Sequence, residues 1–401
     1  MNHIEITEKH KCSGCCACMN ICPTNCIIMR PDEEGFIYPN IDESKCIECG
    51  LCISTCPFIS ESGVTLFADE QPQAYALYHK NEQIRQQSTS GGAFTAICES
   101  FCDNRNYTIF GAGYGDSLNV CHSYVKNIDD LGKFRKSKYV QSEIGMSFTQ
   151  AKQLLNDGKK VLFSGTPCQI AGLKTFLRKP YDNLITVDLV CHGVPSHIMF
   201  DKYKAFMERS YKDTITAIDF RNKRKAGWEN SKISIDFRKR KPYERYSETT
   251  DDPYMNAFLS GLSLRPSCRP CFFAKTLRVS DITIGDFWGI ERIKPQLNDN
   301  KGLSLVLVNT QKARNLFKNI DGIAYIESVD LQNAIKFNGQ LKAPVQANKS
   351  REQFMSDLKL LKFETLIQRY LKPRPLVNRL ATKFLSKKTK QRIKRIIGLN
   401  H

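Results

Sequence analysis

The sequence lacks the long apolar segments that place a chain in or across a membrane. No run approaches the ~18–20 apolar residues of a transmembrane helix. The opening stretch, MNHIEITEKH, lacks the apolar core of a secretory signal. Without a predicted export route, disulfide bonds are not expected, and cysteines are better explained as metal ligands, reactive thiols or buried small side chains. We therefore expect a cytoplasmic protein.

Acidic residues are also scarce, because 41 Asp and Glu oppose 59 Lys and Arg, which gives a formal net charge of +18. Much of the excess lies in residues 365–401, which contain eleven Lys or Arg and no Asp or Glu. Leu376, Leu380 and Phe384 in this tail have the i,i+4 spacing of a basic amphipathic helix. Such a helix could bind an anionic membrane surface peripherally, dock on a partner protein or remain a solvated tail. Nucleic acid is disfavoured, because no nucleic-acid-binding motif accompanies the charge.

Cysteine, by contrast, is abundant: the chain has 17, and ten of them lie within residues 1–60. Two runs with the spacing C-x2-C-x2-C-x3-C-P begin 34 residues apart, at Cys12 and Cys46. This is the bacterial iron–sulfur signature, in which the fourth cysteine of each run crosses to the other cluster. Four-cysteine zinc sites do not require this doubled spacing. We therefore predict two 4Fe-4S clusters, one held by Cys12, Cys15, Cys18 and Cys56, the other by Cys22, Cys46, Cys49 and Cys52.

Downstream of the cysteine runs, strand-like and helix-like segments alternate, which indicates an α/β domain with helices packed on a sheet. Further on, ITAIDFRNK and KISIDFRKR have the pattern of a strand pair, so the sheet content is mixed rather than purely parallel. We expect an α+β or α/β chain with a small ferredoxin-like domain, a mixed-sheet α/β domain and a basic helical tail. The expected segments are 1–60, a polar linker at 61–73, 74–155, 156–345 and the tail 346–401.

Four of the remaining cysteines lie at turns or strand ends. Cys168 follows a predicted strand in FSGTPCQIAGL, Cys191 ends another in LITVDLVC, and Cys268 and Cys271 form a C-x2-C pair in a Pro-rich loop. Strand ends are where α/β folds gather functional groups, so these thiols could form one metal site. The residues alone leave both a 4Fe-4S cluster and zinc open.

The motifs around these cysteines resemble those of a known family. They are STSGGAF, GTPCQIAGL, DLVCHGVPS, FRNKRKAGW and CRPCFFAKTLRVSDITIGDFWGI, in this order. Together they are similar to the coenzyme F-420 hydrogenase/dehydrogenase beta-subunit family, over roughly residues 74–330. The resemblance implies a mixed α/β flavoprotein that binds FAD and an iron–sulfur cluster. By this resemblance, Cys168, Cys191, Cys268 and Cys271 hold a third 4Fe-4S cluster.

A flavin site is less sharply marked in the sequence. The hydroxyl- and glycine-rich stretch STSGG precedes an apolar helix, a pattern that fits both an ordinary helix cap and a diphosphate at a helix N-terminus. The family resemblance favours FAD, and it extends to KYVQSEIG. The residues predicted to bind the cofactor are Ser88, Ser90, Gly91, Gly92, Lys138, Gln141 and Ser142.

Four further residues are candidates for catalysis, each with a structural alternative. Arg221 and Lys223 carry charges that suit an anionic substrate, but a solvated basic strand pair shows the same pattern. Asp286 ends a predicted strand and is either a site carboxylate or a turn residue. His192 is either a proton donor or a structural histidine.

The cysteine motifs and the resemblance together predict an iron–sulfur flavoprotein oxidoreductase. Electrons would pass between the ferredoxin-type clusters, the third cluster and FAD, with hydride transfer to or from a small organic molecule such as coenzyme F-420. Ferredoxin or another redox protein is the expected electron donor or acceptor. The alternative is an electron-transfer subunit of a larger redox complex, which would reduce artificial acceptors but would have no substrate of its own.

Overall fold

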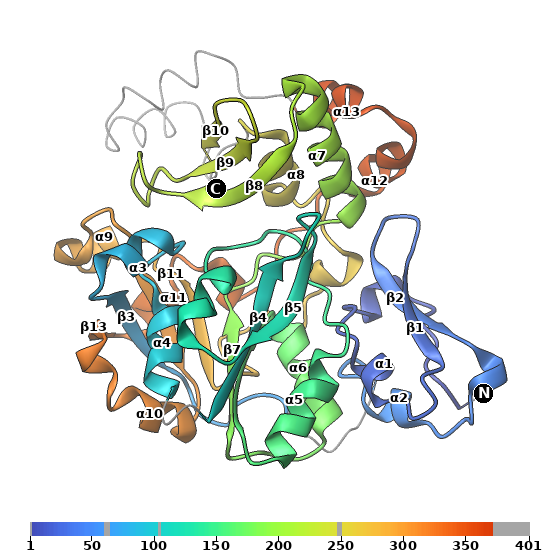
Figure 1. Cartoon of the computed structure of the whole chain (residues 1–401), viewed down its shortest axis with the longest axis horizontal. Helices are drawn as coiled ribbons and strands as arrows, with labels where there is room; N and C mark the ends of the chain where they lie inside the picture. Colours follow the sequence, from blue (N-terminus) through green and yellow to red (C-terminus); the bar gives the residue numbers. More distant parts are fainter. Residues whose placement is uncertain (1, 60–64, 103–105, 247–250, 372–401) are drawn as a thin grey trace.

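The chain was studied as a computed structural model, which describes residues 2–59, 65–102, 106–246 and 251–371. Figure 1 shows a small N-terminal region in blue, a large central sheet flanked by helices, and a smaller sheet with its own helices. The N-terminal region lies against the side of the central part, close to helices α5 (Ser147–Asn156) and α6 (Pro167–Leu177).

The N-terminal region contains one hairpin and two very short helices. Strands β1 (Ile27–Pro31) and β2 (Ile37–Ile41) pair antiparallel. Helices α1 (Ala17–Ile21) and α2 (Leu51–Ser54) each lie inside one of the two cysteine runs. Each run therefore forms a loop followed by about one helical turn. This is the small ferredoxin-like region that the sequence predicts.

The central sheet is mixed, as the sequence predicts. Its strands are β3 (Gln73–His79), β4 (Tyr107–Tyr114), β5 (Val120–Val125), β6 (Lys160–Gly165), β7 (Leu184–Leu189), β11 (Ile282–Asp286), β12 (Ser304–Val308) and β13 (Ala324–Val329). Their order is β13-β3-β12-β11-β7-β6-β4-β5. The four strands β4, β6, β7 and β11 run parallel to their neighbours in this group, and the other pairs are antiparallel.

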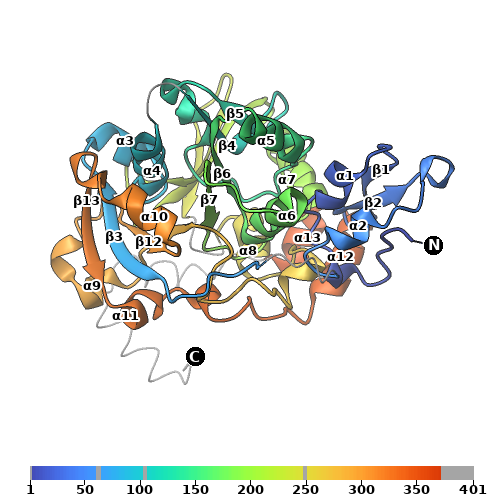
Figure 2. The same ribbon diagram turned by 90° about the horizontal axis from the view of Figure 1, so that it is seen from below.

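Alternate side chains of the strands fill two apolar layers, because successive residues of a strand point to opposite faces. In β6, Leu162 is buried on one face, whereas Val161 and Phe163 are buried on the other. The Leu162 face packs against α4 (Ala93–Phe101) and α10 (Gln311–Phe317), and the Phe163 face against α5 and α6. Figure 2 shows these helices on the two sides of the sheet. The short helices of this part are α3 (Glu82–Gln87), α9 (Ile290–Ile293) and α11 (Leu331–Ile335).

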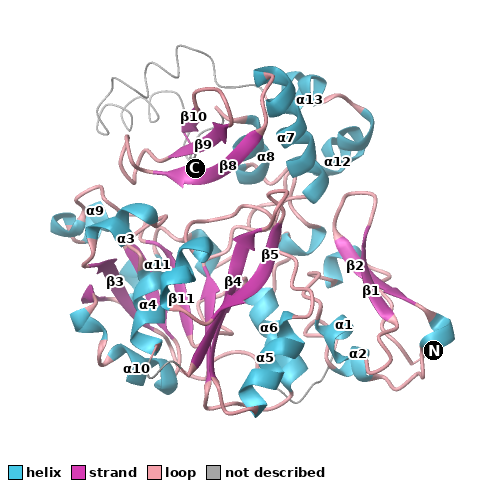
Figure 3. Cartoon of the chain, in the orientation of Figure 1, coloured by secondary structure: helices cyan, strands magenta, loops and turns pink. Residues whose placement is uncertain are grey.

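The predicted strand pair forms a separate antiparallel sheet together with a third strand (Figure 3). Its strands are β8 (Ile215–Asn222), β9 (Lys232–Phe237) and β10 (Tyr243–Tyr246). The helices α7 (His197–Tyr211), α8 (Pro253–Leu259), α12 (Arg351–Leu360) and α13 (Phe363–Tyr370) pack with it around one apolar cluster.

The predicted basic tail is described only up to residue 371. Helices α12 and α13 bury Phe354 and Leu366 in the cluster that also contains residues of α7. The amphipathic stretch with Leu376, Leu380 and Phe384 lies outside the described residues, so its docking on a membrane or a protein stays a prediction. Within the four described ranges, no helix combines the length and the apolar character needed to cross a bilayer.

Candidate functional site

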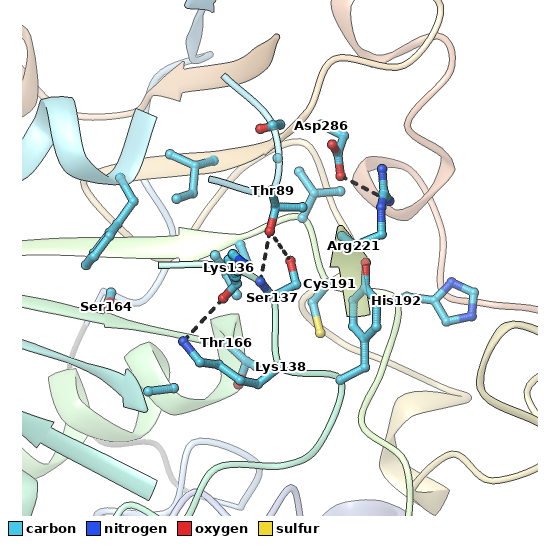
Figure 4. Close-up of a pocket in the computed structure, with 18 of the residues that line it drawn as sticks. Thr89, Lys136, Ser137, Lys138, Ser164, Thr166, Cys191, His192, Arg221 and Asp286 are labelled. Atoms are coloured by element: carbon cyan, nitrogen blue, oxygen red, sulfur yellow. Dashed lines mark hydrogen bonds and ion pairs between the residues drawn. The ribbon is translucent and has the colours of Figure 1, made fainter. Parts of the chain in front are cut away.

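A cavity of about 430 Å³ lies where the parallel strands of the central sheet end. Its wall includes residues 164–166 at the end of β6, residues 189–194 at the end of β7 and residues 284–286 at the end of β11. The carboxyl ends of parallel strands are the usual ligand-binding edge of α/β sheets. Figure 4 shows the polar side chains that point into this space. We therefore take this cavity as the candidate ligand site.

Positive charge dominates the wall of the cavity. Arg135, Lys136, Lys138 and Arg221 line it, and Asp286 is the one acidic residue among the described residues of the wall. Lys136 forms an ion pair with Asp219, which lies behind the wall. The excess of cations favours an anionic ligand.

Lys138 shapes the loop around the cavity. Its Nζ donates to the carbonyl oxygens of Lys133 and Arg135, at 3.1 and 2.8 Å. Burial, together with the charge of Lys136, lowers the pKa of Lys138 to about 7. The side chain thus closes its own loop, while its ammonium also contributes charge to the cavity.

The residues predicted to bind a flavin separate into two groups. Five line the cavity: Ser88, Ser90, Gly92, Lys138 and Ser142. Gly91 and Gln141 do not. A Cβ on Gly91 would lie 2.2 Å from the carbonyl oxygen of Leu77, so this glycine permits close packing on β3. The Gln141 side chain instead donates to the carbonyl oxygen of Ser13, at 2.9 Å, and so contacts the N-terminal region.

The structure adds cavity residues that the motif analysis did not single out. The backbone N–H of Ser137 donates to Thr89 Oγ1 at 2.8 Å, and the two hydroxyl groups lie 3.2 Å apart (Figure 4). This contact joins the loop before α4 to the basic loop that contains Lys136. Thr89 lies within STSGG, but Lys136 and Ser137 lie outside the motifs. The only sequence signal for these two residues is that they belong to a basic stretch with a hydroxyl side chain.

Arg221 and Asp286 come together in the wall, as Figure 4 shows. Their charged groups lie 3.6 Å apart, and the indole Nε1 of Trp228 donates to Asp286 at 2.6 Å. The guanidinium of Arg221 also lies 5.0 Å from the centre of the Trp288 ring. Asp286 is therefore held as a hydrogen-bond acceptor, and Arg221 is fixed in position at the cavity.

The other two catalytic candidates differ in their access to the cavity. His192 lines the cavity; burial lowers its pKa, and its Nε2 has no hydrogen-bond partner among the described residues. Lys223 lies behind the wall, where its Nζ donates to the carbonyl oxygens of Ser90 and Lys301. Burial, with the charge of Arg85 nearby, lowers the pKa of Lys223 to about 7. Lys223 therefore supports the loop before α4 from outside the cavity.

The four cysteines of the core line one smaller cavity, of about 40 Å³. Cys168 is the second residue of α6, Cys191 follows β7, and Cys268 and Cys271 lie in one loop. The backbone N–H of Val194 donates to Cys268 Sγ at 3.4 Å, which joins the second and third of these segments. The structure thus brings together the four thiols that the sequence predicts as one metal site.

The four core thiols are neutral in their buried setting. Burial raises the pKa of each, and raises that of Cys268 to about 12. Such thiols stay protonated at neutral pH until a cation binds them as thiolates. Across the described residues, no three His, Cys, Asp or Glu side chains converge on the position of a single ion; the core cysteines surround a cavity instead.

Arg278 fixes the spacing of the loops that carry these cysteines. It forms an ion pair with Asp188 at 3.1 Å, and both side chains are buried. Its Nη1 donates to the carbonyl oxygen of Phe273, and its Nη2 to that of Leu189, both at 3.1 Å. The C-x2-C loop is thereby tied to the end of β7, where Cys191 lies.

Each predicted set of N-terminal ligands lines its own cavity, of about 20 Å³. In both cases the fourth cysteine of one run joins the first three of the other, as the crossed assignment requires. Cys26, which is outside the C-x2-C spacing, lies 3.3 Å from Cys22 Sγ and lines the same cavity. Cys49 of this second set is exposed at the surface.

The first N-terminal set lies beside the core set. Ser13 and Phe58 line the cavity of the core cysteines. A Cβ on Gly172 of α6 would lie 2.8 Å from Cys15 Sγ, and Thr55 Oγ1 donates to the carbonyl oxygen of Thr175 at 3.0 Å. The helix that begins at the Cys168 turn therefore runs directly past the first N-terminal set.

Two stretches of the chain match known families. Residues 158–334 match the C-terminal part of the coenzyme F-420 hydrogenase/dehydrogenase beta subunit, and residues 11–59 match a 4Fe-4S dicluster domain. The first match contains the four core cysteines, and the second contains both N-terminal runs. The resemblance predicted from the motifs is confirmed.

Individual relatives cover different shares of the chain. A coenzyme F-420-dependent sulfite reductase of Methanocaldococcus jannaschii is 30% identical over 193 residues, which are 48% of this chain and 29% of the relative. An uncharacterized protein of the same organism is 23% identical over 377 residues, 82% of this chain and 92% of the relative. The chain thus spans less than a third of the sulfite reductase but most of the second relative.

One solved structure with which the chain aligns is that of the F-420-reducing NiFe hydrogenase complex of Methanosarcina barkeri. The alignment covers 75% of this chain and 92% of that chain, with 15% identity and a TM-score of 0.44.

Proposed function

We propose that this chain is an iron–sulfur flavoprotein that exchanges electrons between its clusters and an organic substrate. Its residues 158–334 belong to the coenzyme F-420 hydrogenase/dehydrogenase beta-subunit family, and its residues 11–59 form a 4Fe-4S dicluster domain. One observation carries the proposal: Thr166 and residues 191–194 line both the large cavity and the cavity of the core cysteines. A ligand in the large cavity would share a wall with a metal site.

The large cavity fits FAD by its charge and its backbone. FAD, when bound, supplies hydride chemistry, and 4Fe-4S clusters supply single electrons. Arg135 and Lys136 offer positive charge to a diphosphate, and Thr89 and Ser137 offer hydroxyl groups beside them. The loop that contains Thr89 leads into the N-terminus of α4, where helix N–H groups favour a negative charge.

The core cysteines fit a third 4Fe-4S cluster by their number and their burial. Four partly buried thiols from three segments surround one cavity, and as thiolates they would supply the four-cysteine donor set that a 4Fe-4S cluster takes. Two of the four, Cys268 and Cys271, come from one loop, while Cys168 and Cys191 come from adjacent strand ends. We propose that the chain passes electrons from the N-terminal sites through this one to the large cavity.

The substrate proposed is coenzyme F-420 or another organic hydride acceptor, since relatives are named for F-420-dependent reactions. A second candidate is an electron-transfer subunit without its own substrate. The sulfite reductase relative favours it, because this chain matches only 29% of that protein. The exposure of Cys49 also supports this candidate, because a redox protein could exchange electrons with a cluster that Cys49 helps to hold.

Metal and flavin analysis of anaerobically purified protein tests the proposal. We expect about 12 Fe, with a matching amount of sulfide, and one FAD per chain. Cys168→Ser should lower the iron by about four and leave the two N-terminal clusters intact. Cys121→Ser serves as the matched control, because Cys121 lies in β5 and lines neither cavity.

Zinc in place of the third cluster, or protein that binds no flavin, would contradict the assignment. The two candidate functions separate in a kinetic assay with reduced ferredoxin as the donor. An oxidoreductase with its own substrate reduces F-420 or another organic hydride acceptor, whereas an electron-transfer subunit reduces only artificial acceptors such as viologen dyes.

A further inference from the structure

Arg265 is a buried arginine at the contact between the N-terminal region and the core. Its side chain is 0% exposed, and no Asp or Glu forms an ion pair with it in the part of the chain that the structure describes. A buried charge without an opposite charge is costly, so some other group must compensate it. None of the predicted ligand or cofactor sets includes this residue.

The guanidinium makes three hydrogen bonds, two to the N-terminal region and one to Gln141 of the central part. Nε donates to the carbonyl oxygen of Cys12 at 2.8 Å, and Nη2 donates to that of Ile37 at 2.9 Å. Nη1 donates to Gln141 Oε1 at 3.2 Å. The ring of Tyr38 lies 4.5 Å from the guanidinium carbon. The fork of Arg265 therefore has one defined orientation.

The loop of the first cysteine run is shaped to admit this side chain. Gly14 has a φ of +66°, and a Cβ there would lie 2.9 Å from Nη1 of Arg265. A larger residue at this position would therefore both strain the loop and displace the guanidinium. The loop and the arginine fit each other.

Arg265 also belongs to the core metal site. It lines the cavity of the core cysteines, and its carbonyl oxygen accepts the N–H of Cys268 at 3.0 Å. Its own N–H donates to the carbonyl oxygen of Val194 at 2.9 Å. At its other end, Nη2 lies 3.7 Å from Cys12 Sγ, within hydrogen-bonding range of sulfur. One cation thus lies between two sets of cysteines.

We propose that Arg265 is the positioning residue that raises the reduction potential of the first N-terminal cluster and holds this cluster against the core site. Positive charge and N–H donors near the sulfur ligands stabilise the more negative, reduced form of a cluster. The anionic thiolates of the loaded cluster would in turn compensate the buried guanidinium. The effect of Arg265 on the reduction potential rests only on the dicluster domain. That a higher potential directs electrons towards the core also rests on the proposed third cluster.

The second N-terminal set provides the internal comparison. Within the described ranges, no arginine or lysine side chain donates to Cys22, Cys46, Cys49 or Cys52; the backbone N–H of Ile4 donates to Cys52 Sγ at 3.2 Å. Removal of the Arg265 charge should therefore shift one cluster of the pair and leave the other unchanged.

The test is a potentiometric titration of the anaerobic full-length protein followed by EPR, with iron counted in each sample. In Arg265→Gln, one cluster should become harder to reduce, so that at the wild-type midpoint its oxidised-to-reduced ratio rises about tenfold, which is about 59 mV for a one-electron couple. Arg265→Lys, which keeps the charge, should show a smaller shift. Gln141→Glu keeps the arginine but adds an opposing charge beside it, and should shift the same cluster in the same direction.

Arg351→Gln is the matched control. Arg351 is also buried and also joins the two regions, through Glu34 at 2.6 Å and the carbonyl oxygen of Leu264 at 2.7 Å, but it contacts no cysteine in these bonds. Its loss should move no midpoint. If Arg265→Gln loads less iron, the midpoints of Gln141→Glu and Arg265→Lys decide whether the Arg265 charge sets the potential of the first N-terminal cluster.

Unchanged midpoints in loaded Arg265→Gln and Gln141→Glu would overturn the proposal. An equal shift in Arg351→Gln would also overturn it, because the effect would then come from docking rather than from charge. A protein with about 8 Fe would refute the third cluster. In that case a shift in Arg265→Gln would still support the effect of Arg265 on the N-terminal cluster.

Discussion

The N-terminal sites and the proposed core metal site use the same type of ligand, cysteine, but are built in different ways. Each N-terminal site takes three cysteines from one tight loop and one cysteine from the other run. The core site takes its cysteines from three separate segments, between residues 168 and 271. The first kind depends on local spacing, while the second exists only when strands β6 and β7 and the C-x2-C loop are assembled. This difference predicts what each site loses, in iron and in flavin, when one of its residues is replaced.

Loss of a ligand should separate the two kinds of site most clearly. Cys18→Ser should remove about four Fe from the N-terminal region, while FAD stays bound because the large cavity is untouched. Cys268→Ser should remove about four Fe from the core and also weaken FAD, since residues 191–194 line both cavities. Iron and flavin content of the two variants check this. Equal flavin loss in both variants would contradict the separation.

The contact between the two kinds of site should be sensitive to one methyl group. Gly172→Ala would place a Cβ 2.8 Å from Cys15 Sγ, so α6 or the first cysteine loop must shift. Overpacking of this type costs about 1–3 kcal/mol in the free energy of unfolding. A lower unfolding temperature together with faster loss of N-terminal iron under chelator would show it. Gly322→Ala, where no atom lies within 4 Å of the new Cβ, is the control.

The charge of the large cavity should matter more for the flavin than for the clusters. Lys136→Gln removes one cation from the wall and leaves its ion-pair partner Asp219 uncompensated, so we expect about a tenfold weaker affinity for the anionic FAD. Flavin fluorescence on dilution measures the affinity, and the iron content should stay unchanged. Lys159→Gln, an exposed lysine outside the cavity wall, should leave the affinity as it is.

The smallest effect concerns the acid side of the stability profile. His122 lines the large cavity, and burial lowers its pKa to about 4. The unfolded chain therefore binds a proton below about pH 6.5 that the folded chain does not, so stability falls as the pH falls from about 6.5 towards 4. In His122→Phe this part of the loss, at most about 1.4 kcal/mol per pH unit, should disappear. Unfolding temperatures at pH 7.0 and 5.5 measure it; an unchanged difference would contradict the assignment.

The sequence predicts the N-terminal region and the strand framework well, because both depend on local patterns. The cysteine spacing and the alternation of strands and helices are visible without tertiary contacts. The strand pair that indicated mixed sheet content, however, forms the separate sheet β10-β9-β8 rather than part of the central sheet. Gln141 shows the limit: it belongs to a family-like motif, yet it faces the N-terminal region rather than the large cavity. Arg265 and Arg278 act on segments distant in the chain, so no spacing rule indicates them.

The separation of the core ligands has a consequence for biogenesis. The N-terminal runs leave the ribosome before the core segments, and their ligands all come from residues 12–56, so they can receive iron while the core is being made. The proposed core cluster could not assemble until residue 271 has been synthesised and strands β6 and β7 are in place. Maturation should therefore pass through a species loaded only at the N-terminus, which pulse-labelled iron incorporation would reveal as two kinetic phases. Simultaneous loading of all sites would refute this order.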